Sequence, residues 1–180
     1  LFSEGTRFVG NYDAAVQYTL GDIVRVGGQT YTARATSLGI NPDEDPVKWN
    51  LLADGLTLAG RYNPATTYVP GEIVHFGANA YIALVRTTGA FPTNAAKFEL
   101  MLAGSGVPAV WSKTKTDYAI NEQATVGALT YAFKGTGYAT VGASPEVNAD
   151  WVLVHAGTEH KGTYVAGTTY LKGAIVLFGP

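Results

Sequence analysis

The sequence predicts an all-β fold built from small three-stranded sheets of about 50 residues, arranged in tandem as beads on a string or as a fibre. Three observations predict it. One short phrase recurs along the chain, glycine turns separate short runs of β-favouring residues, and no helical periodicity is evident. Since a unit repeated at this interval is typical of one structural module, the phrase also predicts the domain organisation.

The phrase begins at a tyrosine that recurs after 50, 50 and 52 residues, at Tyr18, Tyr68, Tyr118 and Tyr170. Three further landmarks follow in the same order in each complete copy: a second tyrosine, a glycine three residues before a proline, and an aromatic residue. The tyrosines are Tyr31, Tyr81 and Tyr131; the glycine and proline pairs are Gly39 with Pro42, Gly89 with Pro92 and Gly142 with Pro145; the aromatic residues are Trp49, Phe98 and Trp151. We therefore predict a lead-in at 1–7, complete repeats at 8–57, 58–107 and 108–158, and a partial fourth repeat at 159–180.

Each repeat is predicted to contain a hairpin. In DIVRVGGQTYTA two β-favouring runs flank Gly27 and Gly28, and a tight turn needs the positive φ that glycine adopts freely. Val24 and Val26 share one strand face, which we expect to point inward because the matching positions are apolar in every copy, at Val74 and Phe76, Ala124 and Val126, and Val176 and Phe178. A third strand is predicted at WNLLA, FELML and WVLVH, after a loop of roughly fifteen residues.

Composition excludes several classes of protein. Only 14% of the 180 residues are charged and the formal net charge is -2, which does not match the clustered basic patch of a nucleic-acid-binding protein. The sequence has no apolar run of about 18 residues, so no membrane span is expected. It has no cysteine, which excludes disulfides and thiolate metal sites. We expect neither a cofactor nor a metal ion.

A repeat of about 50 residues is close to the lower size limit for an independent core. Because no disulfide compensates, aromatic side chains must supply much of the burial, at roughly 1.5–3 kcal/mol for each large side chain. We therefore expect further stabilisation from neighbouring repeats or from other chains. The predicted partner is the chain itself, in an oligomer or fibre.

The landmarks of the repeat carry a resemblance to a known family. The first repeat has its landmarks in a fixed order: Tyr-x-x-Gly-Asp/Glu-x-Val, then a glycine turn, then Tyr-x-Ala, then Pro and then Trp. These landmarks are Tyr18, Gly21, Asp22, Val24, Tyr31, Ala33, Pro42 and Trp49. This order resembles the chitin-binding-like carbohydrate-binding modules of families 5 and 12, which implies small three-stranded units of the kind attached to chitinases and cellulases. Tandem repeats without a catalytic domain also look like those in tail fibres and other virion proteins of bacteriophages.

One departure from that family concerns its sugar-stacking residue. The family often carries two adjacent aromatics at the last strand, whereas the neighbour here is Asn50, Glu99 or Val152. A flat exposed aromatic face is what such a site needs to bind a sugar ring. The substitutes near the start of each repeat are Tyr12, Tyr62, Trp111 and Tyr164. They are candidate carbohydrate-binding residues, but we favour the alternative that they seal the core or the joint between repeats.

Few residues indicate catalysis. Asp22, Glu72 and Glu122 recur, one in each complete copy, whereas a glycosidase needs two carboxylates about 5–10 Å apart. We expect these acids to accept backbone N–H bonds instead. The acidic loop at 41–46 is interpreted as solvated rather than as a calcium site, because the other copies lack its acids. The histidines, at His75, His155 and His160, do not form a metal-ligand set.

Two functions remain after these exclusions. The first is a non-catalytic structural or adhesive segment of an extended fibre, most simply a phage tail fibre or other virion appendage used in host attachment, at a virion or extracellular surface. The alternative is a glycan-binding array of a secreted hydrolase or adhesin, with a cell-surface glycan as partner. The fourth copy stops at AIVLFGP, where its hairpin should turn. We therefore expect the sequence to be part of a longer polypeptide with further repeats.

Overall fold

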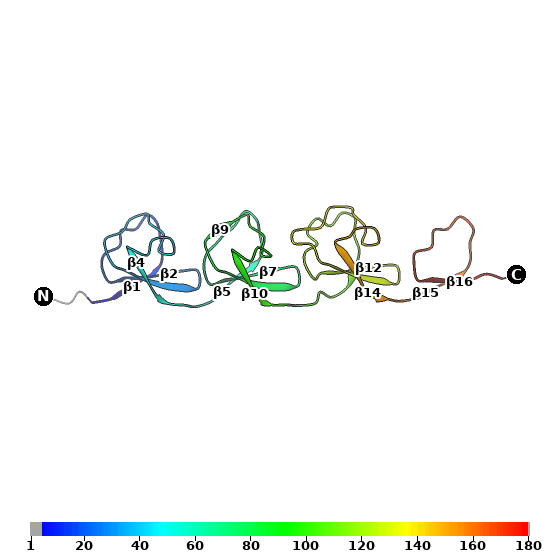
Figure 1. The fold of residues 1–180 in the computed structure, drawn as a ribbon, viewed down its shortest axis with the longest axis horizontal. Helices are drawn as coiled ribbons and strands as arrows, with labels where there is room; N and C mark the ends of the chain where they lie inside the picture. Colours follow the sequence, from blue (N-terminus) through cyan, green and yellow to red (C-terminus); the bar gives the residue numbers. More distant parts are fainter. Residues whose placement is uncertain (1–4, 180) are drawn as a thin grey trace. The chain divides into compact units, whose positions relative to one another are not determined.

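The computed structural model describes residues 5–179 (Figure 1), and these residues form strands, turns and loops without any helix. The predicted all-β fold is confirmed. The chain divides into two compact units, one comprising Leu1–His75 with Ala80–Leu102 and the other Phe76–Asn79 with Ala103–Pro180. The repeat boundaries proposed from the sequence stay predictions, because this division does not coincide with them.

Three four-stranded sheets follow one another along the chain. The first has the order β1-β2-β3-β4, with β1 (Arg7–Asn11), β2 (Asp22–Val26), β3 (Gln29–Ala33) and β4 (Trp49–Ala53). The second has the order β10-β8-β7-β5, with β5 (Thr57–Arg61), β7 (Glu72–Phe76), β8 (Asn79–Ala83) and β10 (Phe98–Leu102). The third has the order β11-β12-β13-β14, with β11 (Ala109–Val110), β12 (Gln123–Val126), β13 (Leu129–Phe133) and β14 (Trp151–Ala156).

Two short pairs complete the described strands. They are β6 (Thr67–Tyr68) with β9 (Thr87–Thr88), and β15 (Glu159–Thr163) with β16 (Ala174–Leu177). In the first pair, β6 precedes the hairpin of the second repeat and β9 lies in the loop after it, and the sequence predicted neither strand. The second pair, β15 with β16, lies in the partial fourth repeat.

The prediction of three strands per sheet was wrong by one strand. Each four-stranded sheet has an additional edge strand, which pairs in parallel with the first strand of the hairpin, at β1–β2, β5–β7 and β11–β12. This strand gives no alternating pattern, since both of its faces are largely exposed and the register skips Val9 in β1. Its pairing is made by the backbone, so the side-chain sequence does not encode it.

The predicted hairpins and inward face are confirmed in the three sheets. Gly27, Gly77 and Gly127 begin the turns with φ of 56°, 61° and 59°. At the inward positions Val24, Val74 and Ala124 are each 0% exposed. The expectation fails in the fourth copy, where Phe178 is 86% exposed. The reason is that β16 has only β15 as a neighbour among the described strands.

The first tyrosine of the phrase has a structural role that explains its recurrence. Its ring is buried in each of the first three copies, and its hydroxyl accepts the backbone N–H of a residue five or six positions earlier. The Asp13 N–H donates to Tyr18 at 2.8 Å, the Asn63 N–H to Tyr68 at 2.7 Å, and the Ser112 N–H to Tyr118 at 2.8 Å. In the fourth copy, the Val165 N–H donates to Tyr170 at 2.8 Å. The hydroxyl thus closes the loop that leads into each hairpin, which phenylalanine could not do.

Candidate functional site

The four candidate carbohydrate-binding aromatics pack on rings of their own repeat. Tyr12 stacks on Tyr18 with ring centroids 5.5 Å apart, and its edge meets Trp49 at 6.0 Å. The other candidates make equivalent contacts: Tyr62 stacks on Tyr68 at 5.7 Å, Tyr164 stacks on Tyr170 at 5.7 Å, and Trp111 packs against the core cluster of the third sheet. They lie in separate repeats, so the structure does not bring them together.

Their exposure differs between copies. Tyr62 is 6% exposed and Tyr164 is 41% exposed, while Tyr12 and Trp111 are half-buried. Burial raises the pKa of Tyr12, so its hydroxyl is neutral at physiological pH. These contacts favour the interpretation that the rings seal the core. Sugar binding by them stays a prediction, and Tyr164 has the most accessible ring of the four.

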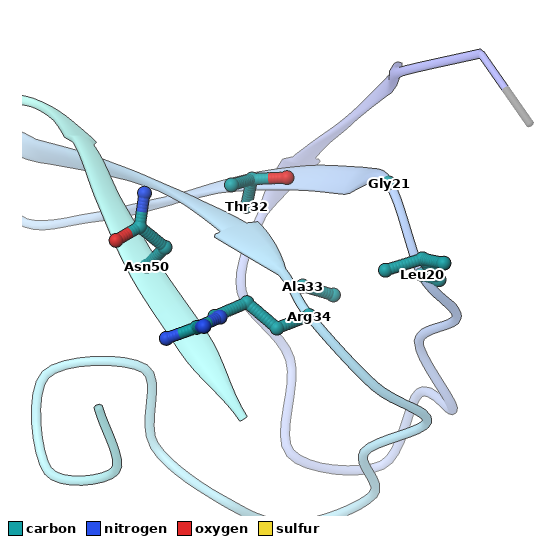
Figure 2. Close-up of a pocket in the computed structure, with 6 residues that line it drawn as sticks. All are labelled: Leu20, Gly21, Thr32, Ala33, Arg34 and Asn50. Atoms are coloured by element: carbon teal, nitrogen blue, oxygen red, sulfur yellow. The ribbon is translucent and has the colours of Figure 1, made fainter. Parts of the chain in front are cut away.

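An open pocket lies beside the last strand of the first sheet. It has a volume of about 590 Å³ and is lined by Leu20, Gly21, Thr32, Ala33, Arg34 and Asn50 (Figure 2). Leu20 and Asn50 lie on opposite sides of it in Figure 2. None of these lining residues is aromatic, so the pocket lacks a stacking platform for a sugar ring.

The matching surface of the second repeat is partly filled by the first repeat. Its pocket of about 280 Å³ is lined by the residues 50 positions later, from Pro70 and Gly71 to Ile82, Ala83 and Leu84. Gln29, Asp54, Gly55 and Leu56 of the first repeat line the same pocket. In the second repeat, this surface is thus where the first repeat docks.

Successive repeats meet at a joint of closely approaching backbones. In the first unit, a Cβ added at Gly55 would lie 2.4 Å from the carbonyl oxygen of Gly28, and one added at Gly71 would lie 2.5 Å from the carbonyl oxygen of Gly55. Such distances are shorter than any ordinary van der Waals contact. The hydroxyl of Thr57 donates to the carbonyl oxygen of Gly27 at 3.2 Å. Glycine is required here because main chain packs directly on main chain.

The same joint recurs twice in the second unit. The N–H of Ala78 donates to the carbonyl oxygen of Ile120 at 3.0 Å, and a Cβ added at Gly173 would lie 2.6 Å from the carbonyl oxygen of Gly157. The side-chain oxygen of Asn79 accepts hydrogen bonds from the Gly104 N–H and from the Asn121 side chain, at 3.1 and 3.0 Å. Sequence reasoning missed this joint, although the glycines that end LLADG, LMLAG and LVHAG were its visible signal.

The recurring acids have the structural role expected of them. Asp22 accepts the backbone N–H of Thr19 at 2.8 Å, and Glu72 accepts that of Val69 at 3.0 Å. Glu122 accepts the N–H of Ala119 at 2.9 Å and the Lys115 ammonium at 3.1 Å. Each carboxylate thus closes the turn before its hairpin.

We predict that replacing Asp22 by Asn weakens the acid sensitivity of the fold. The hydrogen bond from Arg7, 2.9 Å long, holds the pKa of Asp22 below its usual range despite the opposing effect of burial. A depressed pKa stabilises the fold above the unfolded value of about 3.9, and this contribution is lost as the pH falls through the lower folded value. Denaturant midpoints from pH 6 down to pH 2 should therefore fall less steeply in Asp22→Asn than in the wild type. Parallel curves would contradict this.

The interpretation of the acidic loop as solvated was wrong for Asp43. Its side chain is 1% exposed and binds Arg86, with oxygen-to-nitrogen distances of 2.6 and 2.9 Å. Burial alone would lower the pKa of Arg86, but the hydrogen bond and charge of Asp43 outweigh it and raise that pKa. This ion pair joins the first and second repeats. The sequence did not reveal it because the partners lie 43 positions apart and the other copies lack the acid.

Replacing Asp43 by Asn should destabilise the first unit by about 1.5 kcal/mol, the usual worth of a hydrogen bond to a charged group. The substitution keeps the shape of the side chain but leaves the Arg86 guanidinium without its buried anion. Urea denaturation measures the loss. Glu44→Gln is the matched control, since Glu44 is 52% exposed and lies 3.5 Å from Arg86, and it should change little. Equal effects of the two substitutions would refute the assignment.

Residues 5–179 contain no group of three or more His, Cys, Asp or Glu side chains placed to hold a metal ion. The same residues include no helix of the length and apolarity that a bilayer span requires. Comparison with known proteins adds no family: no family model matches the sequence, and no curated protein matches it. The resemblance to carbohydrate-binding modules of families 5 and 12 therefore stays a prediction.

Proposed function

We propose that this chain is a non-catalytic structural and adhesive segment of an extended fibre, such as a phage tail fibre or another virion appendage, at a virion or extracellular surface. The observation that carries the proposal is the joint. In both units a later repeat meets the preceding one through main-chain contacts, at Gly71 with Gly55, at Ile120 with Ala78 and at Gly173 with Gly157. A chain built this way gains length in equal steps.

The joint also favours a stiff fibre over beads on a flexible string. Only Asp54, Gly55 and Leu56 separate β4 from β5, and Gly55 packs against the preceding hairpin turn. The ion pair between Asp43 and Arg86 adds a side-chain contact beside this joint. A three-residue connection held in this way leaves little freedom for one repeat to swing against the next.

The carboxylates support a structural rather than a catalytic assignment. Asp22, Glu72 and Glu122 are engaged by backbone N–H groups, and Asp43 is buried against Arg86. A general acid or base must instead reach a substrate within hydrogen-bonding distance. The acids that the repeats share are therefore used to close turns.

The proposal is tested by lengthening the chain. In a variant that carries residues 58–107 twice in tandem, small-angle X-ray scattering should give a longer maximum dimension with an unchanged cross-sectional radius. A matched control carries a Gly/Ser insert of equal length at the same position, and it should broaden the distance distribution as a flexible coil does. Indistinguishable scattering from the two variants would contradict a stiff joint.

A glycan panel that includes chitin tests the alternative, with tryptophan fluorescence as the readout. The proposed function predicts no saturable quenching that depends on the candidate carbohydrate-binding aromatics, Tyr12, Tyr62, Trp111 and Tyr164. Saturable quenching that is lost in Trp111→Ala, with the circular dichroism spectrum intact, would instead favour the glycan-binding array.

A further inference from the structure

The edge strand of each four-stranded sheet contributes little to a core. Its large apolar side chains are exposed: Phe8 of β1 is 63% exposed, Leu58 of β5 is 72% exposed, and Val110 of β11 is 82% exposed. Because so little apolar area is buried, main-chain hydrogen bonds must hold this strand to the hairpin. The strand nevertheless recurs where the chain enters each sheet, which indicates a role other than core packing.

Backbone hydrogen bonds fasten the edge strand at both of its ends, at corresponding places in all four repeats. At the start, the N–H of Arg7 donates to the carbonyl oxygen of Gly21 at 3.0 Å. The corresponding bonds are Thr57 to Gly71 at 2.9 Å, Gly106 to Asn121 at 3.0 Å and Glu159 to Gly173 at 2.9 Å. At the end, the N–H of Tyr12 donates to the carbonyl oxygen of Arg25 at 2.9 Å. The corresponding bonds are Tyr62 to His75 at 2.8 Å, Trp111 to Thr125 at 2.9 Å and Tyr164 to Leu177 at 2.7 Å.

Two rows of paired residues show how the chain enters and leaves the first sheet. One row joins Phe8, Ile23, Thr32 and Asn50 across the four strands, and the other joins Asn11, Arg25, Thr30 and Ala53. The edge strand and the last strand both run from the first row to the second, so the chain enters at one end of the sheet and leaves at the opposite end. The third sheet has the same arrangement, with one row of Ala109, Ala124, Tyr131 and Leu153 and another of Val110, Thr125, Thr130 and His155.

This arrangement determines how tension acts on a sheet. A pull on the two ends of the chain draws the entry and the exit of the sheet apart, along the direction of the strands. Ladder hydrogen bonds lie across that direction, so the pull loads all the bonds of the edge strand together. The twist of roughly 20–25° between neighbouring strands tilts the entry and exit directions without reversing them. An edge strand that paired antiparallel would instead enter at the exit end, and its bonds would break one after another.

We propose that each four-stranded sheet is a load-bearing element that resists tension along the chain, with the parallel edge strand held in shear against the hairpin. The proposal accounts for a parallel pair in an exposed position, where antiparallel pairing is the usual arrangement. The second sheet has the same parallel pairing at its edge, between β5 and β7. The inference rests on the proposed fibre function, because a fibre that is attached at both ends carries tension.

Single-molecule force spectroscopy of the full chain at constant force tests the proposal, with introduced cysteines as handles because the chain has none of its own. In the variant Gly5→Cys/Ala53→Cys, the pull runs from the entry of the first sheet to its exit. In Gly5→Cys/Arg34→Cys both handles lie at the entry end, since Arg34 follows the end of β3, and the edge strand is peeled off bond by bond. At the same force, the first sheet should unfold at least about tenfold more slowly in the entry-to-exit variant, because more backbone bonds must break in the rate-limiting step.

The third sheet offers the same comparison. Val107→Cys/Ala156→Cys pulls from entry to exit, and Val107→Cys/Lys134→Cys places both handles at the entry end. All the substituted residues are exposed, and urea midpoints verify that the two variants of each pair are equally stable. In either sheet, entry-to-exit unfolding that is as fast as peeling, or faster, would overturn the proposal. Such a result in a chain that still lengthens on repeat duplication would overturn the load-bearing role while leaving the fibre function standing.

Discussion

Replacing Trp49 by Ala is expected to cost about 3–5 kcal/mol, the loss typical of removing a large aromatic side chain from a core. Trp49 is 1% exposed, and its ring meets those of Tyr12 and Tyr18 at centroid distances of 6.0 and 5.3 Å. Its indole N–H donates to the carbonyl oxygen of Ile40 at 3.2 Å. The substitution thus removes a central packing element and leaves a backbone acceptor without its partner.

The matched control for this prediction is Trp49→Phe. Phe98 occupies the equivalent position of the second repeat, where it is 1% exposed and its ring meets that of Tyr68 at 6.1 Å. Phenylalanine should therefore fill most of the site, and the loss should be much smaller than for alanine. Urea denaturation followed by circular dichroism measures both variants. Similar losses for alanine and phenylalanine would mean that ring packing is not what Trp49 contributes.

Replacing Gly104 by Ala should destabilise the second unit by about 3 kcal/mol, the upper end of the usual cost of overpacking. The added Cβ would lie 2.1 Å from the carbonyl oxygen of Ala78. A backbone oxygen cannot rotate away as a side chain can, so the joint must open or the strands must shift. Gly104 is not among the glycines with positive φ, so backbone strain is not the cause. The melting temperature of a unit of this size should fall by roughly 4–8 °C for each kcal/mol.

Gly5→Ala is the control for that variant, because no atom lies within 4 Å of an added Cβ there and its φ is not positive. Amide exchange distinguishes the two ways in which the clash can be relieved. Faster exchange of the Ala78 N–H, which donates to Ile120, would show that the joint opens. An unchanged melting temperature together with unchanged exchange would contradict the described joint.

The features that the sequence predicted well are those encoded in local side-chain patterns. Glycine pairs and alternating apolar residues identified the hairpins and the inward-facing Val24. The recurring aromatics identified the buried start of each third strand, at Trp49 and its equivalents. These signals each need only a few neighbouring residues, so a single sequence is sufficient to recognise them.

The features that were missed depend on the backbone or on distant partners. The edge strand β1 pairs in parallel with β2 through main-chain groups. Its sequence, RFVGN, has no alternation of buried and exposed residues that would predict a strand. The joint depends on the absence of a side chain at Gly55 and its equivalents. In a sequence, such a glycine looks the same as a glycine in an ordinary turn. Asp43 forms an ion pair with Arg86, which lies 43 positions later in the sequence, and no local pattern could indicate that contact.

The glycine joint has a consequence for how such a gene can change. Because the contact is made by main chain and requires little beyond the absence of side chains, any two repeats that keep their glycines can become neighbours. Loss or gain of a whole repeat by unequal recombination would then restore a working junction without compensating substitutions elsewhere. The number of repeats could then change while the individual repeats diverge at positions outside the joint, the buried cores and the tyrosines and acids that close the turns.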